Sequence, residues 1–238
     1  MKTMKLILPI ALITLSLTSC KKMFGYVKGK GDNVTEIRPA AGFDRISLPI
    51  NATVIYIQDS VYSLKVTGQS NILAVLTTDV KDGELEIDFK KNVLRHNTVT
   101  VEVHAPELHG LSLSGSGNIT VGPLTTSLLR MKISGSGNMY LQSLTAEQVE
   151  SAISGSGDIE VTAGTANAQT CTISGSGDIN TLGLQAQHSI TKISGSGDIT
   201  IHSQQTLGAT ISGSGDIRYL GTPVMNVNIS GSGSVTHL

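Results

Sequence analysis

The stretch ISGSGDIT, residues 193–200, decides the fold, because its core recurs along the whole second half of the chain. Copies of the SGSG motif begin at Ser114, Ser134, Ser154, Ser174, Ser194, Ser212 and Ser230. Successive copies thus start twenty positions apart four times and then eighteen positions apart twice. A nearly fixed period of this size indicates a structural repeat.

Apolar residues alternate with polar ones on both sides of each motif. Leu129, Met131 and Ile133 precede the second copy, and Met139 and Leu141 follow it. Alternation with a period of two predicts short strands with one buried face. No segment of the repeats has the spacing of a helix. Each repeat is therefore predicted to be one coil of a β-solenoid.

In such a stack, every motif becomes the same corner, and equivalent residues of neighbouring coils lie about 4.8 Å apart. Glycine suits this corner because it adopts positive φ or allows close approach of adjacent backbones. Serine and Asx side chains there can form ladders between coils. The predicted corner glycines are Gly115, Gly117, Gly135, Gly137, Gly155, Gly157, Gly175, Gly177, Gly195, Gly197, Gly213, Gly215, Gly231 and Gly233. The predicted Asx ladder consists of Asn118, Asn138, Asp158, Asp178, Asp198 and Asp216.

The predicted fold class is all-β: a single-stranded, right-handed parallel β-helix with one coil per repeat of about twenty positions and an irregular N-terminal capping section. Right-handedness follows from the usual hand of crossovers between parallel strands. A β-propeller needs about 40 residues per blade, and leucine-rich repeats have another signature. Left-handed hexapeptide helices repeat a branched residue every six positions, which this chain does not.

The N-terminus has the pattern of an exported lipoprotein. Lys2 and Lys5 precede an apolar run that is too short to span a bilayer, which predicts a signal peptide over residues 1–19. LTSC at 17–20 resembles the lipobox of bacterial lipoproteins, which implies cleavage before Cys20 and its lipidation. Residues 20–33 are then a lipidated, flexible tether, 34–110 a capping part of the β-helix and 111–238 the repeat β-helix. SNILAVLTTDVKDG at 70–83 predicts a short helix with Ser70 as N-cap.

Composition excludes some functions. Removing residues 1–19 leaves fifteen basic and eighteen acidic side chains, so no nucleic acid partner is predicted. Cys171 is the one cysteine after Cys20, so the body has no internal disulfide, and Cys171 is expected to be a small core residue.

The segments GFDRISLPINATVIYIQ (42–58), DGELEI (82–87) and VTVEVHAPELHGLSLSGSGNI (99–119), followed by repeated SGSGDI, resemble the auto-transporter adhesin head GIN domain family. The resemblance covers residues 40–238. It implies a parallel β-helix similar in shape to pectate lyases, found in exported bacterial proteins and without established catalytic residues. SLPINAT lacks a glycine corner, and Ser234 replaces the acid of the last copy.

No catalytic constellation emerges from the residues. The acids form one column of identical positions, without a distinct acid and nucleophile. The histidines His104, His109, His188, His202 and His237 occupy different repeat phases. The motif is similar to the turns of calcium-binding β-rolls, but one acid per repeat supplies too few ligands for Ca²⁺. No metal and no cofactor are therefore predicted. If the column is partly sheltered from water, like charges should raise the pKa of some of its carboxyls or recruit a cation. Asp178→Asn with Asp198→Asn should then keep or raise the melting temperature at pH 7.

The function predicted is that of a non-enzymatic cell-envelope lipoprotein, an adhesin-like or ligand-binding β-helical scaffold. It would attach to a membrane, expected to be the outer membrane, through its lipid anchor, and bind an extracellular glycan or protein. The alternative is a polysaccharide-active lyase or hydrolase, which would need a basic residue facing the acids across a groove.

Overall fold

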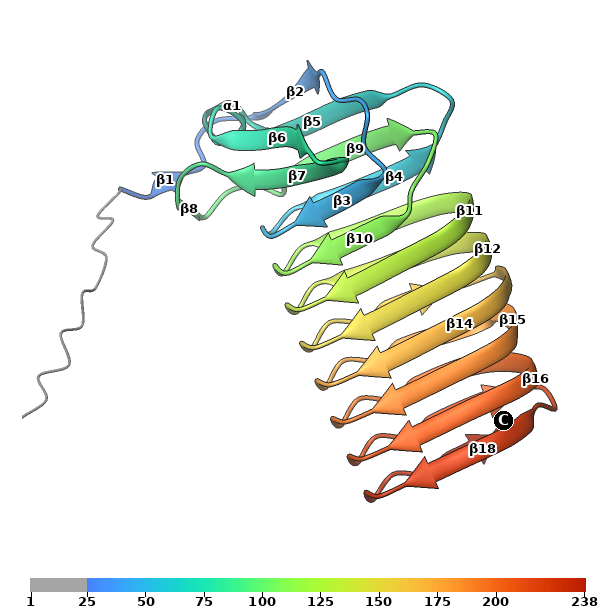
Figure 1. Ribbon diagram of the computed structural model, residues 1–238. Helices are drawn as coiled ribbons and strands as arrows, with labels where there is room; N and C mark the ends of the chain where they lie inside the picture. Colours follow the sequence, from blue (N-terminus) through green and yellow to red (C-terminus); the bar gives the residue numbers. More distant parts are fainter. Residues whose placement is uncertain (1–24) are drawn as a thin grey trace, which may run out of the picture.

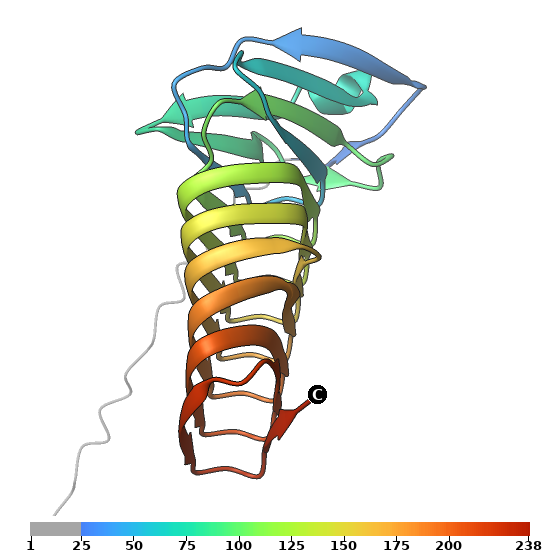
Figure 2. The same ribbon diagram turned by 90° about the vertical axis from the view of Figure 1, so that its right-hand side faces the viewer.

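A computed structural model describes residues 25–238, which form a right-handed parallel β-helix with a wider N-terminal section at one end (Figures 1 and 2). The predicted fold class is confirmed. The strands of the repeat section are β10 (Gly110–Leu113), β11 (Asn118–Ile133), β12 (Asn138–Ile153), β13 (Ile159–Val161), β14 (Gly164–Ile173), β15 (Ile179–Ile193), β16 (Ile199–Ile211), β17 (Ile217–Leu220), β18 (Val224–Ile229) and β19 (Val235–His237).

The coils stack in the register that the repeat predicts. Asn118 pairs with Asn138 and Ile133 with Ile153, so each residue lies over its equivalent in the adjacent coil. The shorter period of the last coils is absorbed between β15 and β16, where the register shifts between Thr181 and Gln185 and again between Ala186 and His188. The shorter coils therefore lose residues at the bend opposite the SGSG corner, and the corner itself stays unchanged.

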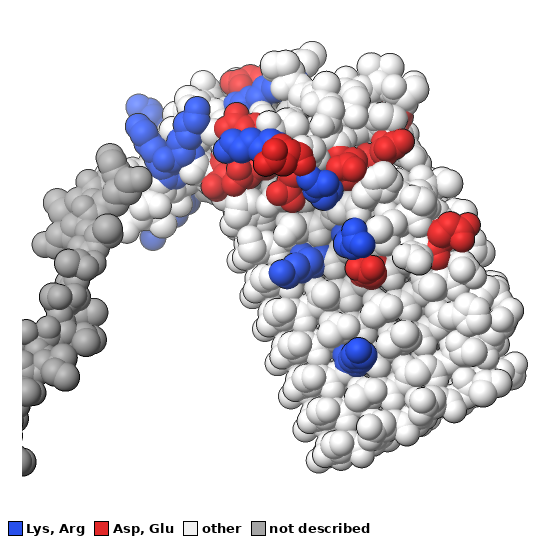
Figure 3. Space-filling model, in the orientation of Figure 1, with Lys and Arg blue, Asp and Glu red and all other residues white. Residues whose placement is uncertain are grey.

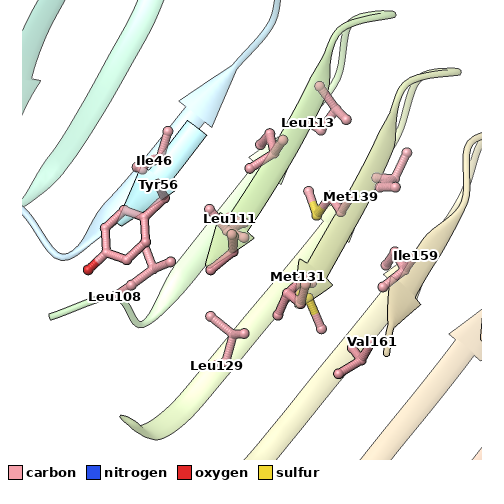
Figure 4. Packing of buried hydrophobic residues seen from close by; sticks show 14 of the residues in the cluster. Ile46, Tyr56, Leu108, Leu111, Leu113, Leu129, Met131, Met139, Ile159 and Val161 are labelled. Carbon is pink, nitrogen blue, oxygen red and sulfur yellow. The ribbon is translucent and has the colours of Figure 1, made fainter. Parts of the chain in front are cut away.

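Inward-facing residues build columns of the hydrophobic core along the axis (Figure 4). Ile46, Leu111 and Met131 occupy one such column, and Cys171 lies further along it. Within the described residues, the core cluster runs from Phe43 to Ile217. Cys171 is 1% exposed, as expected for a small core residue, and its burial raises the pKa of the thiol to about 12.

The N-terminal section closes one end of the stack. Its elements are β1 (Val27–Lys28), β2 (Asn33–Arg38), β3 (Arg45–Leu48), β4 (Thr53–Gln58), β5 (Ser63–Gln69), α1 (Ser70–Leu73), β6 (Leu76–Lys81), β7 (Glu84–Phe89), β8 (Val93–Leu94) and β9 (Thr100–Ala105). On one face β9 pairs in parallel with β4, and β5 and β2 continue in antiparallel order. On the other, β7 pairs in parallel with β3, and β6 follows as an antiparallel edge. Antiparallel strands thus replace further coils at this end.

The short helix predicted near residue 70 is present as α1, but its predicted N-cap is wrong. Gln69 is the N-cap residue, and its side chain makes no capping hydrogen bond. That side chain instead donates to the backbone oxygen of Gly31 at 2.9 Å and accepts from the backbone N–H of Asn97 at 3.0 Å. Gln69 therefore joins the first described residues to the loop before β9.

The predicted signal peptide and Cys20 lie outside the described residues. Within residues 25–238, no helix has the length and apolarity needed to cross a bilayer.

Candidate functional site

The SGSG corners bring adjacent backbones into direct contact. The N–H of Ser156 donates to the carbonyl oxygen of Gly135 at 3.0 Å, and the bond recurs in later coils. A Cβ atom on Gly155 would overlap that same oxygen. None of the fourteen corner glycines has φ in the left-handed region. Close approach of backbones, and not positive φ, is therefore what requires glycine here.

The contact runs in one direction, from each corner to the coil before it, and this explains why the first corner, PINA at 49–52, has no glycine. PINA, residues 49–52, links β3 to β4 just as SGSG links later strands. A Cβ on Gly115 would lie 2.7 Å from the oxygen of Ile50, so each corner presses on the coil before it. The segment that stacks on PINA from the N-terminal end of the β-helix is loop 90–99, which joins β7 to β9. This loop is wider than a four-residue corner and leaves room for side chains.

The Asx residues form a hydrogen-bond ladder along the edge of the β-helix. An Oδ1 atom in each coil accepts the backbone N–H of the Asx residue one coil further on, at 2.7–2.9 Å. The acceptors are Asn138, Asp158, Asp178 and Asp198. Asn118 stands in the same column, but the N–H of Asn138 bonds to the oxygen of Gly117 instead. At the other end, Ser234 donates both its N–H and its hydroxyl to Asp216 Oδ1.

Asp216 is not among the carboxyls with a raised pKa. Hydrogen bonds from the backbone and hydroxyl of Ser234 hold the pKa of Asp216 below its usual value, and the charge of Arg218 acts in the same direction. Arg218 contacts Asp198 at 2.9 Å and Asp216 at 3.4 Å. A lowered folded-state pKa stabilises the fold above the unfolded pKa of about 4, and this contribution is lost as pH falls through the folded value.

Asp178→Ala is expected to lower the melting temperature by about 2–4 °C, because it removes the acceptor for the N–H of Asp198, a bond worth about 1 kcal/mol. Asp178→Asn should melt within about 1 °C of wild type at pH 7, since an amide oxygen accepts the same bond at Asn138. Thermal unfolding of the three proteins measures both effects. A clear rise for Asp178→Asn would show that charge repulsion governs the column after all.

The serines of the SGSG motifs make no side-chain hydrogen bonds within the described residues. Ser234, which follows the last motif, does donate through its hydroxyl. Only the Asx column, with Ser234 at its end, therefore carries the inter-coil side-chain bonds of the predicted ladder.

The histidines named from the sequence do not come together. Two bind neighbouring carboxylates: His104 Nδ1 lies 3.2 Å from Asp59 and His109 Nδ1 lies 3.0 Å from Asp44. Hydrogen bonding from His104 lowers the pKa of Asp59. His188, His202 and His237 contact Thr206, Gln204 and Gly221 respectively. Among residues 25–238, no group of three or more His, Cys, Asp or Glu side chains has an arrangement that could hold a metal ion.

A groove of about 360 Å³, which we call the threonine groove, crosses the four coils of β11, β12, β14 and β15 at the bend opposite the glycine corners. Thr125, Thr145 and Thr165 stack in register along it, and all three are exposed. Its lining is completed by Thr126, Ala146, Ala166, Glu147, Asn167 and Gln187. The groove therefore offers threonine hydroxyls repeated at the spacing of the coils, with one carboxylate and two amides beside them.

A second hollow, of about 310 Å³, lies where the N-terminal section meets the repeats. Asp44, Arg45, His109 and Arg130 line it. Each basic group already has a partner: Arg45 contacts Asp44 at 3.3 Å, and Arg130 contacts Glu150 at 3.0 Å. Figure 3 shows that charged side chains on this face gather over the N-terminal section and the first coils.

Sequence reasoning missed a buried polar group inside the repeats. Gln169 is 2% exposed and bonds Thr181 at 2.8 Å and Ser189 at 3.1 Å. The sequence does contain a sign of this group. Gln169 occupies the column of Leu129 and Val149, where the alternation of apolar and polar residues predicts an apolar side chain. Since its amide has these partners, the group is part of the core and not an open site.

Solved structures resemble this chain closely. A "putative adhesin" from Bacteroides fragilis has a TM-score of 0.85 and 27% identity, with 89% of this chain and 100% of the other covered. A "putative adhesin" and a "putative lipid binding protein" from Parabacteroides distasonis each have a TM-score of 0.73 and 28% identity, with 90% of this chain and 100% of theirs covered. Comparison with curated proteins finds no match.

A comparison of the sequence with protein-family models agrees with these structural similarities. Residues 42–223 match the family described as "Putative auto-transporter adhesin, head GIN domain". The match extends from β3 to the loop between β17 and β18. This range contains the corner glycines from Gly115 to Gly215, the Asx ladder and the threonine groove. The chain belongs to the auto-transporter adhesin head GIN domain family.

Proposed function

We propose that this chain is a non-enzymatic lipoprotein of the cell envelope that binds an extended polar ligand, a glycan or a protein segment, along its β-helix. Family membership and the adhesin names of the similar structures support the adhesin-like part of this proposal. LTSC at 17–20 supports the lipid anchor, and the outer membrane is the proposed site of attachment.

The threonine groove carries the binding proposal. Its hydroxyls repeat at about 4.8 Å along the axis, so a ligand lying across the coils meets equivalent donors and acceptors at every step. The groove has no aromatic side chain among its lining residues, so affinity would come from several hydrogen bonds and not from stacking. Such a surface suits a chain-like ligand with many polar groups.

A binding screen tests this function. Residues 25–238 are applied to arrays of bacterial and host glycans and of extracellular matrix proteins, and each hit is measured again with Thr145→Val/Thr165→Val. Two lost hydrogen bonds should weaken binding by roughly tenfold or more. Thr172→Val/Thr210→Val, on another face, is the matched control and should bind like wild type. If a ligand bound equally well to both double variants, the groove would not be its binding site.

The alternative, a polysaccharide lyase or hydrolase, has one observation in its favour, the mixed charges around the hollow of Arg45 and Arg130. The basic groups there bond to adjacent acids, Arg45 to Asp44 and Arg130 to Glu150. Incubation with the glycans that bind, followed by assay of reducing ends and unsaturated products, separates the two functions. Products that depend on Arg45 and His109 would support the enzyme.

A further inference from the structure

Five basic side chains gather where the described chain begins. They are Lys28, Lys30, Lys90, Lys91 and Arg95, and all are exposed. None of the five takes part in an ion pair within the described residues, whereas Arg38, Arg45, Lys65, Lys81, Arg130 and Arg218 all do. Figure 3 shows blue side chains collected at this side of the N-terminal section. We call residues 25–33 and 90–97 the basic corner.

The basic corner differs in charge from the rest of the molecule. Its residues include five Lys and Arg side chains and one acid, Asp32. The remaining described residues carry eight basic and seventeen acidic side chains. A local positive field on an otherwise acidic protein is a feature that selects anionic partners.

Backbone hydrogen bonds fix the two segments of the corner against each other. The N–H of Val27 donates to the oxygen of Asn92 at 2.9 Å, and the N–H of Gly29 donates to that of Arg95 at 3.0 Å. The side chain of Asn71 bridges the same segment to α1, through bonds of 2.7 and 3.0 Å. The five charges are therefore held on one surface and do not depend on a free tether.

Two apolar side chains accompany the charges. Tyr26, directly before β1, is 64% exposed, and Leu94, in β8, is 42% exposed. The strands β1 and β8 pair at this corner. An amphipathic tyrosine ring and an aliphatic chain beside basic groups are suited to the interface of a bilayer. A soluble polyanion would use the charges but not these two side chains.

The acidic ladder does not cancel the field of the corner. Loop 90–99 occupies the position that SGSG has in later coils, so Asp158 lies four coils further along the same edge. At about 4.8 Å per coil that is roughly 20 Å, about twice the screening length at physiological salt. An anionic surface would therefore attract the corner and repel the ladder, which turns the repeats away from it.

We propose that the basic corner docks on a membrane surface rich in anionic phospholipid. The choice of a membrane rests on the proposed lipid anchor: the six steps of chain from Cys20 to Tyr26 span at most about 20 Å, so an anchored chain keeps the corner beside the bilayer. Each exposed Lys or Arg near such a surface raises the partition coefficient by roughly fivefold.

Vesicle co-sedimentation of residues 25–238 tests the docking surface. Residues 25–238 contain the hydrophobic core cluster from Phe43 to Ile217 but not Cys20. A lack of vesicle binding is therefore a different result from a lack of lipid labelling. We expect binding to vesicles in which about one third of the lipid is phosphatidylglycerol and the rest phosphatidylcholine. Binding should be lost in about 0.5 M NaCl and should be weak on phosphatidylcholine alone. Lys90→Gln/Lys91→Gln should weaken binding at least tenfold.

The matched control is Lys132→Gln/Lys192→Gln, which removes two exposed and unpaired cations of the repeat section within the described chain. It should bind within about twofold of wild type. Equal loss in both double variants would show a general charge effect and overturn the proposal, as would equal binding to neutral vesicles. Glycerol phosphate at the same phosphate concentration should not compete. Full competition would identify a site for free phosphate instead.

Discussion

Gly195→Ala is expected to lower the melting temperature by about 6 °C or more, although it adds a single methyl group. The new Cβ would overlap the carbonyl oxygen of Gly175 in the preceding coil. That oxygen also accepts the N–H of Ser196 at 3.0 Å, so the coils cannot move apart without loss of the bond. Overpacking of this kind costs about 3 kcal/mol, and each kcal/mol corresponds to about 2–4 °C in a chain of this size.

Gly208→Ala provides the control within the adjacent strand β16. A Cβ there would have its nearest neighbours, Ile190 Cγ1 and Ser189 O, at 4.0 Å, an ordinary contact. The melting temperature of this variant should equal or exceed that of wild type, because alanine loses less conformational entropy than glycine on folding. Circular dichroism melts of both variants measure the difference. If Gly195→Ala melted within a degree of Gly208→Ala, the stacked-corner account would be wrong.

Cys20→Ala is expected to abolish lipid labelling and to move the protein from the membrane fraction to the soluble or secreted fraction. The thiol of Cys20 is the predicted acceptor of the first acyl group, and stable anchoring requires the acyl chains. Metabolic labelling with an alkyne fatty acid and fractionation of the cells measure both changes. Cys171→Ala is the control, because its buried thiol should leave labelling unchanged. Undiminished labelling of Cys20→Ala would exclude the lipoprotein prediction.

The repeat section was largely predictable because its period specifies its contacts. Once coils of equal length stack, alternation settles which side chains face inward, and Met131 and Cys171 must share a column. The sequence left two reasons for glycine open, and only the backbone geometry selects close approach over positive φ. The sequence could not show the direction of the contact between corners either. For this reason PINA at 49–52 looks in the sequence like a departure from the glycine motif, although it forms a corner.

The chemistry of the ladder was harder to predict than its position. Spacing alone brings Asp178 and Asp198 into adjacent coils, where bare Coulomb reasoning predicts repulsion. A carboxylate oxygen that accepts a backbone N–H opposes that repulsion, and whether the N–H points toward it depends on the exact path of the corner. The basic corner was also hidden, because Lys28 and Lys90 are far apart in the sequence and meet only through the pairing of β1 with β8.

The one-way contact of the glycine corners has a genetic consequence. The corner glycines press on the carbonyl oxygens of the coil before them, and these oxygens are equivalent in successive SGSG coils. A unit of one coil can therefore be duplicated or deleted in frame between two others without a new clash at the corner. Recombination between the DNA segments that encode successive SGSGDI motifs would produce such changes. Lengths among related genes should therefore differ by whole coils, each of which changes the reach of the rod by about 4.8 Å. Selection could then adjust the distance between the cell and whatever the protein binds without any change in the binding surface itself.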